Sequence, residues 1–157
     1  LSALPIFAEE IKRLGFSKED TTLVTPDMGG IRRIKILSEL LNGMDYASVE
    51  KNRDLVTGDL NVEIIHGDVK KRVVIVDDMI STGNTIRKVS EALNIREAKK
   101  ILVVATHGLF SANAYTRIEQ SSIERVFVTN TLVQSQTSSK ITTVDISSFL
   151  CSIMNNA

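Results

Sequence analysis

Two short, uninterrupted apolar runs constrain the fold of this chain most strongly. VVIV at residues 73–76 and ILVVA at residues 101–105 contain only aliphatic side chains. Such runs are typical of strands that are buried on both faces, as in parallel sheets covered by crossover helices. Five further runs predict strands with weaker signals, at residues 22–25, 46–49, 62–65, 125–128 and 141–144.

Helical patterns lie between several of these predicted strands. The sequence predicts helices over residues 6–14, over 31–41 with Gly43 as the stop, around 86–93, over 111–121, and over 147–154 with a serine as the cap. Alternating strands and helices predict a three-layer, doubly wound α/β fold around a mostly parallel sheet. Two polar runs, at residues 54–61 and 133–140, predict loops.

Composition narrows the class of protein. The 157 residues suit a single domain over residues 1–157, and 19 basic residues balance 19 acidic ones. This balance argues against a nucleic-acid or membrane-surface partner, and no apolar run has membrane-spanning length. The single cysteine, Cys151, excludes an internal disulfide and favours a reducing, cytoplasmic setting. Its apolar neighbours predict a buried, unreactive thiol.

The stretch VVIVDDMISTGNTI, at residues 73–86, holds the strongest candidate site. In open parallel sheets, ligands bind beyond the carboxyl ends of strands, and the strand at 73–76 delivers Asp77 and Asp78 there. The following loop opens a helix at about residue 85, where unpaired N–H groups and the helix dipole favour an anion. The predicted phosphate cradle consists of Ser81, Thr82, Gly83, Asn84 and Thr85.

Carboxylates beside a phosphate cradle suggest a particular ligand. They accept hydrogen bonds from sugar hydroxyls or hold Mg²⁺, so a ligand with a phosphate and a vicinal diol, such as a ribose 5-phosphate, would use both parts. The alternative is an ordinary strand-to-helix turn with capping residues. The loop matches neither the dinucleotide-binding glycine pattern nor the P-loop pattern.

The same stretch closely resembles the phosphoribosyl-pyrophosphate motif of type I phosphoribosyltransferases and ribose-phosphate diphosphokinases. Other stretches resemble the diphosphokinases in family order: VTPDMGG (24–30), EKNRD (50–54), VEIIHGDV (62–69), THGLFSANA (106–114), VTNT (128–131) and KITTVDIS (140–147). The resemblance covers the C-terminal half of that enzyme. Asn84 and Val133 depart from it, since the family more often has glycine and proline there.

The resemblance implies a type I phosphoribosyltransferase-like fold and a reaction. The diphosphoryl group of ATP is transferred to ribose 5-phosphate, giving phosphoribosyl pyrophosphate and AMP with Mg²⁺ as the cofactor. It makes Lys51 the catalytic residue and Arg53 a substrate-phosphate contact. It also makes Asp27 a Mg²⁺ ligand and assigns Asp77 to the ribose hydroxyls, with Asp78 assisting through a cation or the same diol. Without it, EKNRD is interpreted as a solvated turn and Asp27 as a helix cap.

The resemblance also implies that most ATP contacts come from an N-terminal half, so this chain alone is expected to be inactive. Members assemble into homo-oligomers. Two alternatives remain open: a stand-alone type I phosphoribosyltransferase, and a non-catalytic subunit associated with a diphosphokinase. The histidines, His66 and His107, are interpreted as hydrogen-bonded structural residues. The remaining cations of the helices are assigned to solvated faces: Arg32, Arg33, Lys35, Arg87 and Lys88.

Overall fold

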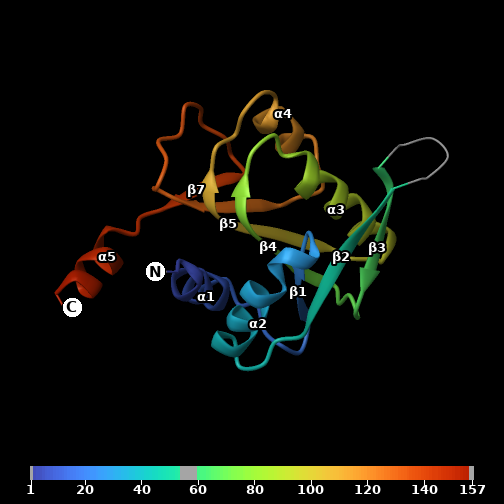
Figure 1. Cartoon of the computed structure of the whole chain (residues 1–157), viewed down its shortest axis with the longest axis horizontal. Coiled ribbons are helices and arrows are strands. Elements are labelled where there is room, and N and C mark those ends of the chain that lie inside the picture. Colours follow the sequence, from blue (N-terminus) through green and yellow to red (C-terminus); the bar gives the residue numbers. More distant parts are fainter. Residues whose placement is uncertain (1, 54–59, 156–157) are drawn as a thin grey trace.

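The computed structural model describes the backbone of residues 2–53 and 60–155, and the side chains of residues 2–50 and 64–155. Figure 1 shows the elements in chain order. They are α1 (Leu4–Arg13), β1 (Thr21–Thr25), the 3₁₀ turn η1 (Met28–Gly30), α2 (Ile31–Leu40), β2 (Tyr46–Arg53), β3 (Leu60–His66), β4 (Arg72–Ile80), α3 (Asn84–Ile95), β5 (Lys100–Gly108), α4 (Ala114–Glu119), β6 (Arg125–Thr129), β7 (Ile141–Val144) and α5 (Ser147–Met154).

The strands form one sheet in the order β3-β2-β1-β4-β5-β6-β7. Only the β2–β3 pair is antiparallel among the pairs that the structure describes; the other five neighbours run parallel. The two strongest apolar runs lie in the adjacent central strands β4 and β5, as expected for strands that are covered on both faces. The predicted mostly parallel α/β fold is confirmed.

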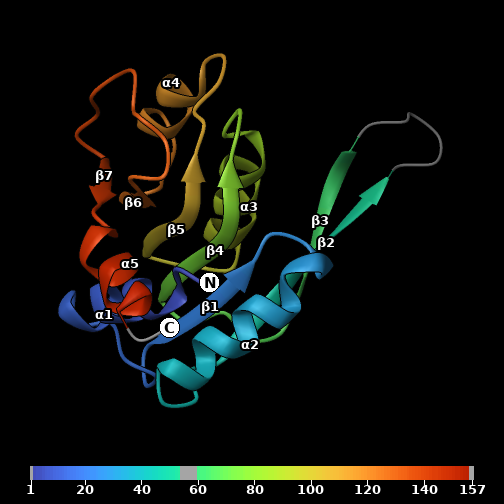
Figure 2. The same cartoon turned by 60° about the vertical axis from the view of Figure 1, so that its left-hand side comes forward.

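Helices cover both faces of the sheet, and Figure 2 shows α2 and α3 on opposite sides of it. Side chains alternate along a strand, so β4 contributes Val73 and Ile75 to one core and Val74 and Val76 to the other. The first core includes the apolar stripes of α3 and α4, and the second includes those of α1 and α2. The three-layer prediction is therefore confirmed.

Several predicted boundaries shift in the structure. The apolar run at 73–76 is only the first part of β4, because β5 continues to pair with it as far as Ile80. The loop predicted over 54–61 ends earlier, since Leu60 already belongs to β3; residues 54–59 lie outside the described residues. The helix predicted over 111–121 forms only from Ala114 to Glu119.

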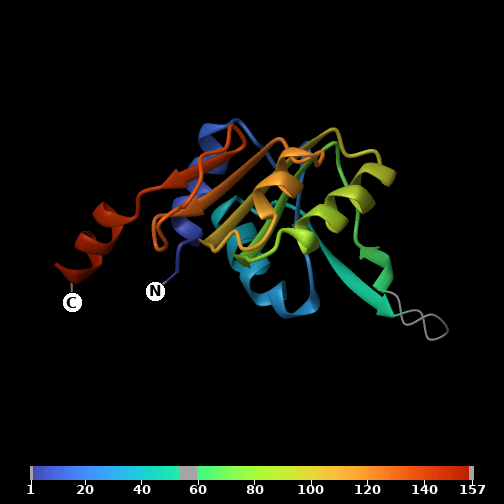
Figure 3. The same cartoon turned by 90° about the horizontal axis from the view of Figure 1, so that it is seen from above.

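The helix α5 lies at the far end of the chain and extends away from the sheet in Figures 1 and 3. No residue of α5 is buried in the described part of the chain. Cys151 is exposed, so the prediction of a buried thiol is wrong: the apolar run forms a helix whose residues are at most half-buried among the described residues. The predicted serine cap is also wrong, because the N-cap residue is Ile146 and Ser147 already lies in the helix, where its N–H and hydroxyl both donate to Asp145 Oδ1, at 2.9 Å and 2.6 Å.

None of the described helices combines the length and the apolar composition that crossing a bilayer requires.

Candidate functional site

Most of the predicted site residues lie at the carboxyl ends of the central strands β1 and β4. β1 pairs with β4 only as far as Val24 opposite Ile75, whereas β5 accompanies β4 to Ile80. The last residues of β4 therefore extend past β1, and Asp77 and Asp78 lie on this extension. Both residues belong to the strand itself, which ends at Ile80, directly before the predicted phosphate loop.

The carboxylates of Asp77 and Asp78 form a tight cluster with one guanidinium. Asp77 Oδ1 accepts a hydrogen bond from the Asp78 N–H at 2.8 Å. Arg33 of α2 places Nη2 3.0 Å from Asp78 Oδ2 and Nη1 3.8 Å from Asp77 Oδ1. The Asp77 side chain is 14% exposed, whereas that of Asp78 is 66% exposed. The carboxylate of Asp77 is thus largely shielded from solvent, whereas that of Asp78 faces it.

This environment separates the acidities of the two groups. Burial, and then the neighbouring Asp78, raise the pKa of Asp77 from 3.8 to about 7. The pKa of Asp78 is lowered, first by the interaction of its side chain with Asp77 and then by the nearby Arg33 guanidinium. Near neutral pH, Asp78 is therefore the firmly ionised member of the pair, and Asp77 is the member that exchanges a proton.

The raised pKa of Asp77 predicts a pH-dependent stability. Between about pH 4 and about pH 7 the folded chain binds more protons at this carboxyl than the unfolded chain, so stability falls as the pH rises. Asp77→Asn removes the ionisation. We expect the variant to gain stability relative to the wild type across this interval, measured by urea unfolding at about pH 5 and about pH 8. An equal difference at both values would contradict the assignment. The lowered pKa of Asp78 affects stability only below this interval, where stability falls as the pH falls.

The loop after β4 has the backbone of an anion cradle. Gly83 precedes α3 with φ of +75°, and the helix begins at Asn84. Arg87 is the first residue whose N–H bonds back into the turn, at 3.1 Å to Gly83 O, so the earlier N–H groups point out of the helix end. Gly83, rather than Asn84, takes the left-handed conformation, which glycine adopts without steric cost.

The segment around α4 supports this loop from behind. Ser111 N–H donates to Ser81 O at 3.0 Å, and the two serine hydroxyls are 3.1 Å apart. Arg117 Nη1 donates to Thr82 O at 2.8 Å. The THGLFSANA stretch and the helix after it thus fix carbonyl groups of the loop, so its N–H groups remain directed outward.

Alanine in place of Gly83 should strain the loop without a clash. A Cβ there would lie 3.5 Å from Ala114 O, an ordinary contact, but positive φ costs other residues about 1–2 kcal/mol. We expect a stability loss of that size, and weaker phosphate binding, measured by urea unfolding and calorimetric titration. Gly15→Ala is the matched control, with φ of +71° and no atom within 4 Å of its Cβ. Equal phosphate affinity in both variants would contradict a role for the loop.

Asp27 closes the turn between β1 and α2. Its Oδ1 accepts from Gly30 N–H at 3.1 Å, and its backbone carbonyl accepts from Thr25 Oγ1 at 3.0 Å. Asp27 therefore caps the short turn η1, which leads directly into α2, whereas the N-cap of α2 itself is Gly30. Asp27 is exposed, and no three metal-ligating side chains gather among the described residues. A Mg²⁺ ion held with few protein oxygens would fit such a place, because Mg²⁺ keeps waters and substrate phosphates as ligands.

The backbone of Lys51 and Arg53 lies in β2, but their side chains lie outside the described residues. β2 runs parallel to β1, and Ser48 pairs with Thr25, so both positions lie past the carboxyl end of β1. Residues two apart on a strand share a face. The alternative of a surface turn at EKNRD is wrong, because residues 50–53 belong to the strand.

The two histidines behave as predicted. His66 Nε2 lies 2.8 Å from Glu50 Oε2, and His107 Nδ1 lies 2.8 Å from Thr131 Oγ1. The assignment of Arg33 to a solvated helix face is wrong, because its side chain is only 26% exposed and contacts both carboxylates. Nothing in the helical periodicity distinguishes Arg33 from Arg32, so only the packing of α2 beside the end of β4 reveals it.

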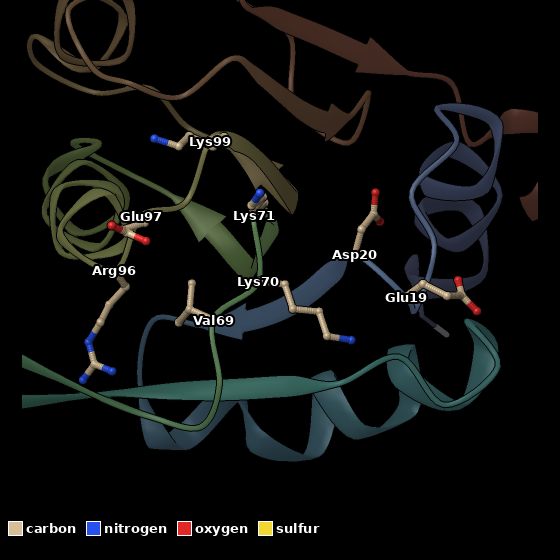
Figure 4. A pocket seen from close by; sticks show the side chains of 8 residues that line it. All are labelled: Glu19, Asp20, Val69, Lys70, Lys71, Arg96, Glu97 and Lys99. Carbon is tan, nitrogen blue, oxygen red and sulfur yellow. The ribbon is translucent and has the colours of Figure 1, made fainter.

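A separate pocket of about 430 Å³ lies at the opposite edge of the sheet, near the amino ends of β1, β4 and β5 (Figure 4). Its walls carry charges of both signs: Glu19, Asp20, Lys70, Lys71, Arg96, Glu97 and Lys99, with Val69. Lys70 pairs with Asp45, and Asp20 pairs with Arg72. In Figure 4 the cationic ends point in different directions. This pocket is distinct from the candidate site.

Sequence comparisons agree with this geometry. The profile of the phosphoribosyl synthetase-associated domain matches residues 54–156. The ribose-phosphate pyrophosphokinase of Thermotoga maritima is 38% identical over 154 residues, covering 96% of this chain and 48% of the relative. That of Sulfolobus acidocaldarius is 41% identical over 128 residues, covering 80% and 43%. The chain thus spans about half the length of these relatives.

Solved structures give the same result. The phosphoribosylpyrophosphate synthetase of Mycobacterium smegmatis superposes with a TM-score of 0.85 at 28% identity, over 99% of this chain and 51% of that one. A purine phosphoribosyltransferase of Pyrococcus horikoshii superposes with a TM-score of 0.54 at 23% identity, which supports the shared fold alone. The profile, the relatives and the superposed synthetase all match over most of the length of this chain. The chain therefore belongs to the ribose-phosphate pyrophosphokinase family.

Proposed function

We propose that this chain is the ribose 5-phosphate-binding, C-terminal half of a ribose-phosphate diphosphokinase, folded as a single domain. The observation that carries the proposal is the joint placement of two unlike groups at one sheet edge. Asp77 and Asp78 lie near the end of β4, and the cradle at residues 81–85 begins directly after the strand ends at Ile80. A sugar diol and a 5-phosphate of one ligand require that combination.

In this proposal each predicted residue has one task. Ser81, Thr82, Gly83, Asn84 and Thr85 bind the 5-phosphate, while Asp77 and Asp78 accept the ribose hydroxyls. Asp27 contributes a carboxylate oxygen to Mg²⁺, which would neutralise the transferring phosphates when bound. Lys51 stabilises the charge that develops on the transferring group, and Arg53 grips a substrate phosphate.

The ATP contacts belong to the part of the enzyme that the resemblance does not cover. We expect the 157-residue chain alone to bind ribose 5-phosphate weakly and to turn over little ATP. The complete enzyme is expected to be a cytoplasmic homo-oligomer that uses ATP and ribose 5-phosphate, with no nucleic-acid or membrane partner.

Product analysis tests this function in the full-length protein. Incubation with ATP, ribose 5-phosphate and Mg²⁺ should yield phosphoribosyl pyrophosphate and AMP in equal amounts. Phosphorus NMR measures both products. ADP as the nucleotide product would contradict diphosphoryl transfer. Release of diphosphate from phosphoribosyl pyrophosphate in the presence of a nucleobase would instead support a stand-alone phosphoribosyltransferase. Failure to form any product, together with co-purification on an active diphosphokinase, would support the non-catalytic subunit.

A further inference from the structure

Arg33 is the cation that faces the carboxylates of Asp77 and Asp78, and no sequence pattern assigned it to the site. Each of its two terminal nitrogens lies near one of the acids: Nη2 lies 3.0 Å from Asp78 Oδ2, and Nη1 lies 3.8 Å from Asp77 Oδ1. Among the described residues, these two carboxylates are its only ion-pair partners. A guanidinium presents its donors in a rigid fork, so it can address two acids at once, whereas an ammonium is a point charge.

The helix α2 delivers Arg33 to this position. Ile34 and Leu37 are fully buried, which fixes the rotation of the helix about its axis. Arg32 is exposed, so consecutive arginines on one helix have different surroundings. Gly30, one turn earlier, lacks a side chain where a Cβ would lie 3.4 Å from Arg33 Nη1. The turn that carries Asp27 and the arginine that reaches β4 therefore form one packed unit.

The two acids need such a partner. Adjacent carboxylates repel one another, and the side chain of Asp77 is largely removed from water. A nearby cation favours their ionised forms, which are the stronger acceptors of hydroxyl hydrogen bonds. A fork that contacts both acids also fixes their separation, which a vicinal diol must match.

We propose that Arg33 is a positioning residue that holds Asp77 and Asp78 in register for the two adjacent hydroxyls of the ribose. The inference rests on the proposed function, since it concerns how that site distinguishes its sugar. It makes Arg33 a determinant of the preference for ribose over 2-deoxyribose phosphates. Arg33 itself need not touch the sugar.

The test compares two ligands in the full-length protein, by calorimetric titration of ribose 5-phosphate and 2-deoxyribose 5-phosphate. The wild type should prefer ribose 5-phosphate. In Arg33→Gln, affinity for ribose 5-phosphate should fall by about tenfold or more, and the preference should shrink because the deoxy ligand loses less. Arg33→Lys, which keeps the charge without the fork, should restore part of the affinity. Arg32→Gln is the matched control and should change neither.

The outcomes separate this inference from the proposed function. Equal losses for both ligands in Arg33→Gln would indicate a general structural role and overturn the positioning role. An unchanged preference would overturn it as well. If Arg33→Gln fails to fold, the same comparison in Arg33→Lys decides, since full preference there would remove the need for the fork. A wild type that binds neither ligand would instead overturn the proposed function.

Discussion

Replacing Lys51 with alanine in the full-length protein is expected to lower the turnover of ATP and ribose 5-phosphate about 10²- to 10³-fold. Diphosphoryl transfer builds charge on the transferring group, and fixed cations stabilise that charge more than water does. The strand register supports this role, because β2 carries Lys51 past the carboxyl end of β1, the edge where Asp27 and Asp77 lie. The measurement is kcat and KM at saturating Mg²⁺.

Lys35→Ala is the control for this experiment, because Lys35 is an exposed cation of α2 whose loss removes the same charge. Thermal unfolding of Lys35→Ala should match the wild type, since an exposed surface substitution changes stability little. Thermal unfolding of Lys51→Ala is measured alongside it, so that a loss of fold is not mistaken for a loss of catalysis. A loss confined to kcat would mark Lys51 as acting on the transition state. A wild-type rate in Lys51→Ala would remove it from the mechanism.

The second large effect is expected at Gly30. A Cβ at this position would lie 1.9 Å from Thr25 Oγ1 and 3.1 Å from Thr25 Cβ, both within a buried side chain at the end of β1. Thr25 cannot move freely, because its hydroxyl donates to the Asp27 carbonyl. Gly30→Ala should therefore cost about 3 kcal/mol or more of unfolding free energy, at the upper end of overpacking effects. Urea unfolding measures this.

Gly29→Ala provides the comparison for Gly30→Ala. Its Cβ would meet only the side-chain Oδ1 of Asp27, at 3.2 Å, a tight contact that a shift of a few tenths of an ångström relieves. We expect a clearly smaller loss of stability at Gly29. Equal losses at the two glycines would show that backbone freedom, rather than the packing of the turn on β1, explains the TPDMGG pattern.

The sheet could be predicted from the sequence because its central strands are buried on both faces. The runs at 73–76 and 101–105 contain no polar residue, and they fall in neighbouring central strands. The start of α3 could be predicted because a glycine and several hydroxyls before a helical stripe indicate an N-terminus, and Gly83 does take the left-handed conformation. The motif order supplied the remaining assignments by resemblance.

Features that depend on distant neighbours could not be predicted in this way. β4 extends to Ile80 because β5 pairs with it, and no local pattern reports that partner. Arg33 and Arg32 look alike in sequence, and only the docking of α2 distinguishes them. Cys151 lies in an apolar run whose helix has no fully buried residue among those described, so hydrophobicity alone predicted the wrong burial. Arg117 reaches Thr82 across 35 positions of sequence.

Calorimetric titration of ribose 5-phosphate into the full-length protein and its Asp77→Asn variant tests the central claim most directly. The claim is that the end of β4 and the α3 cradle form one ribose-phosphate site. The wild type should bind ribose 5-phosphate more tightly than inorganic phosphate. Asp77→Asn should weaken the sugar phosphate by about tenfold or more while leaving inorganic phosphate unchanged. Equal affinity of the wild type for both ligands, or an unchanged affinity in Asp77→Asn, would contradict the account.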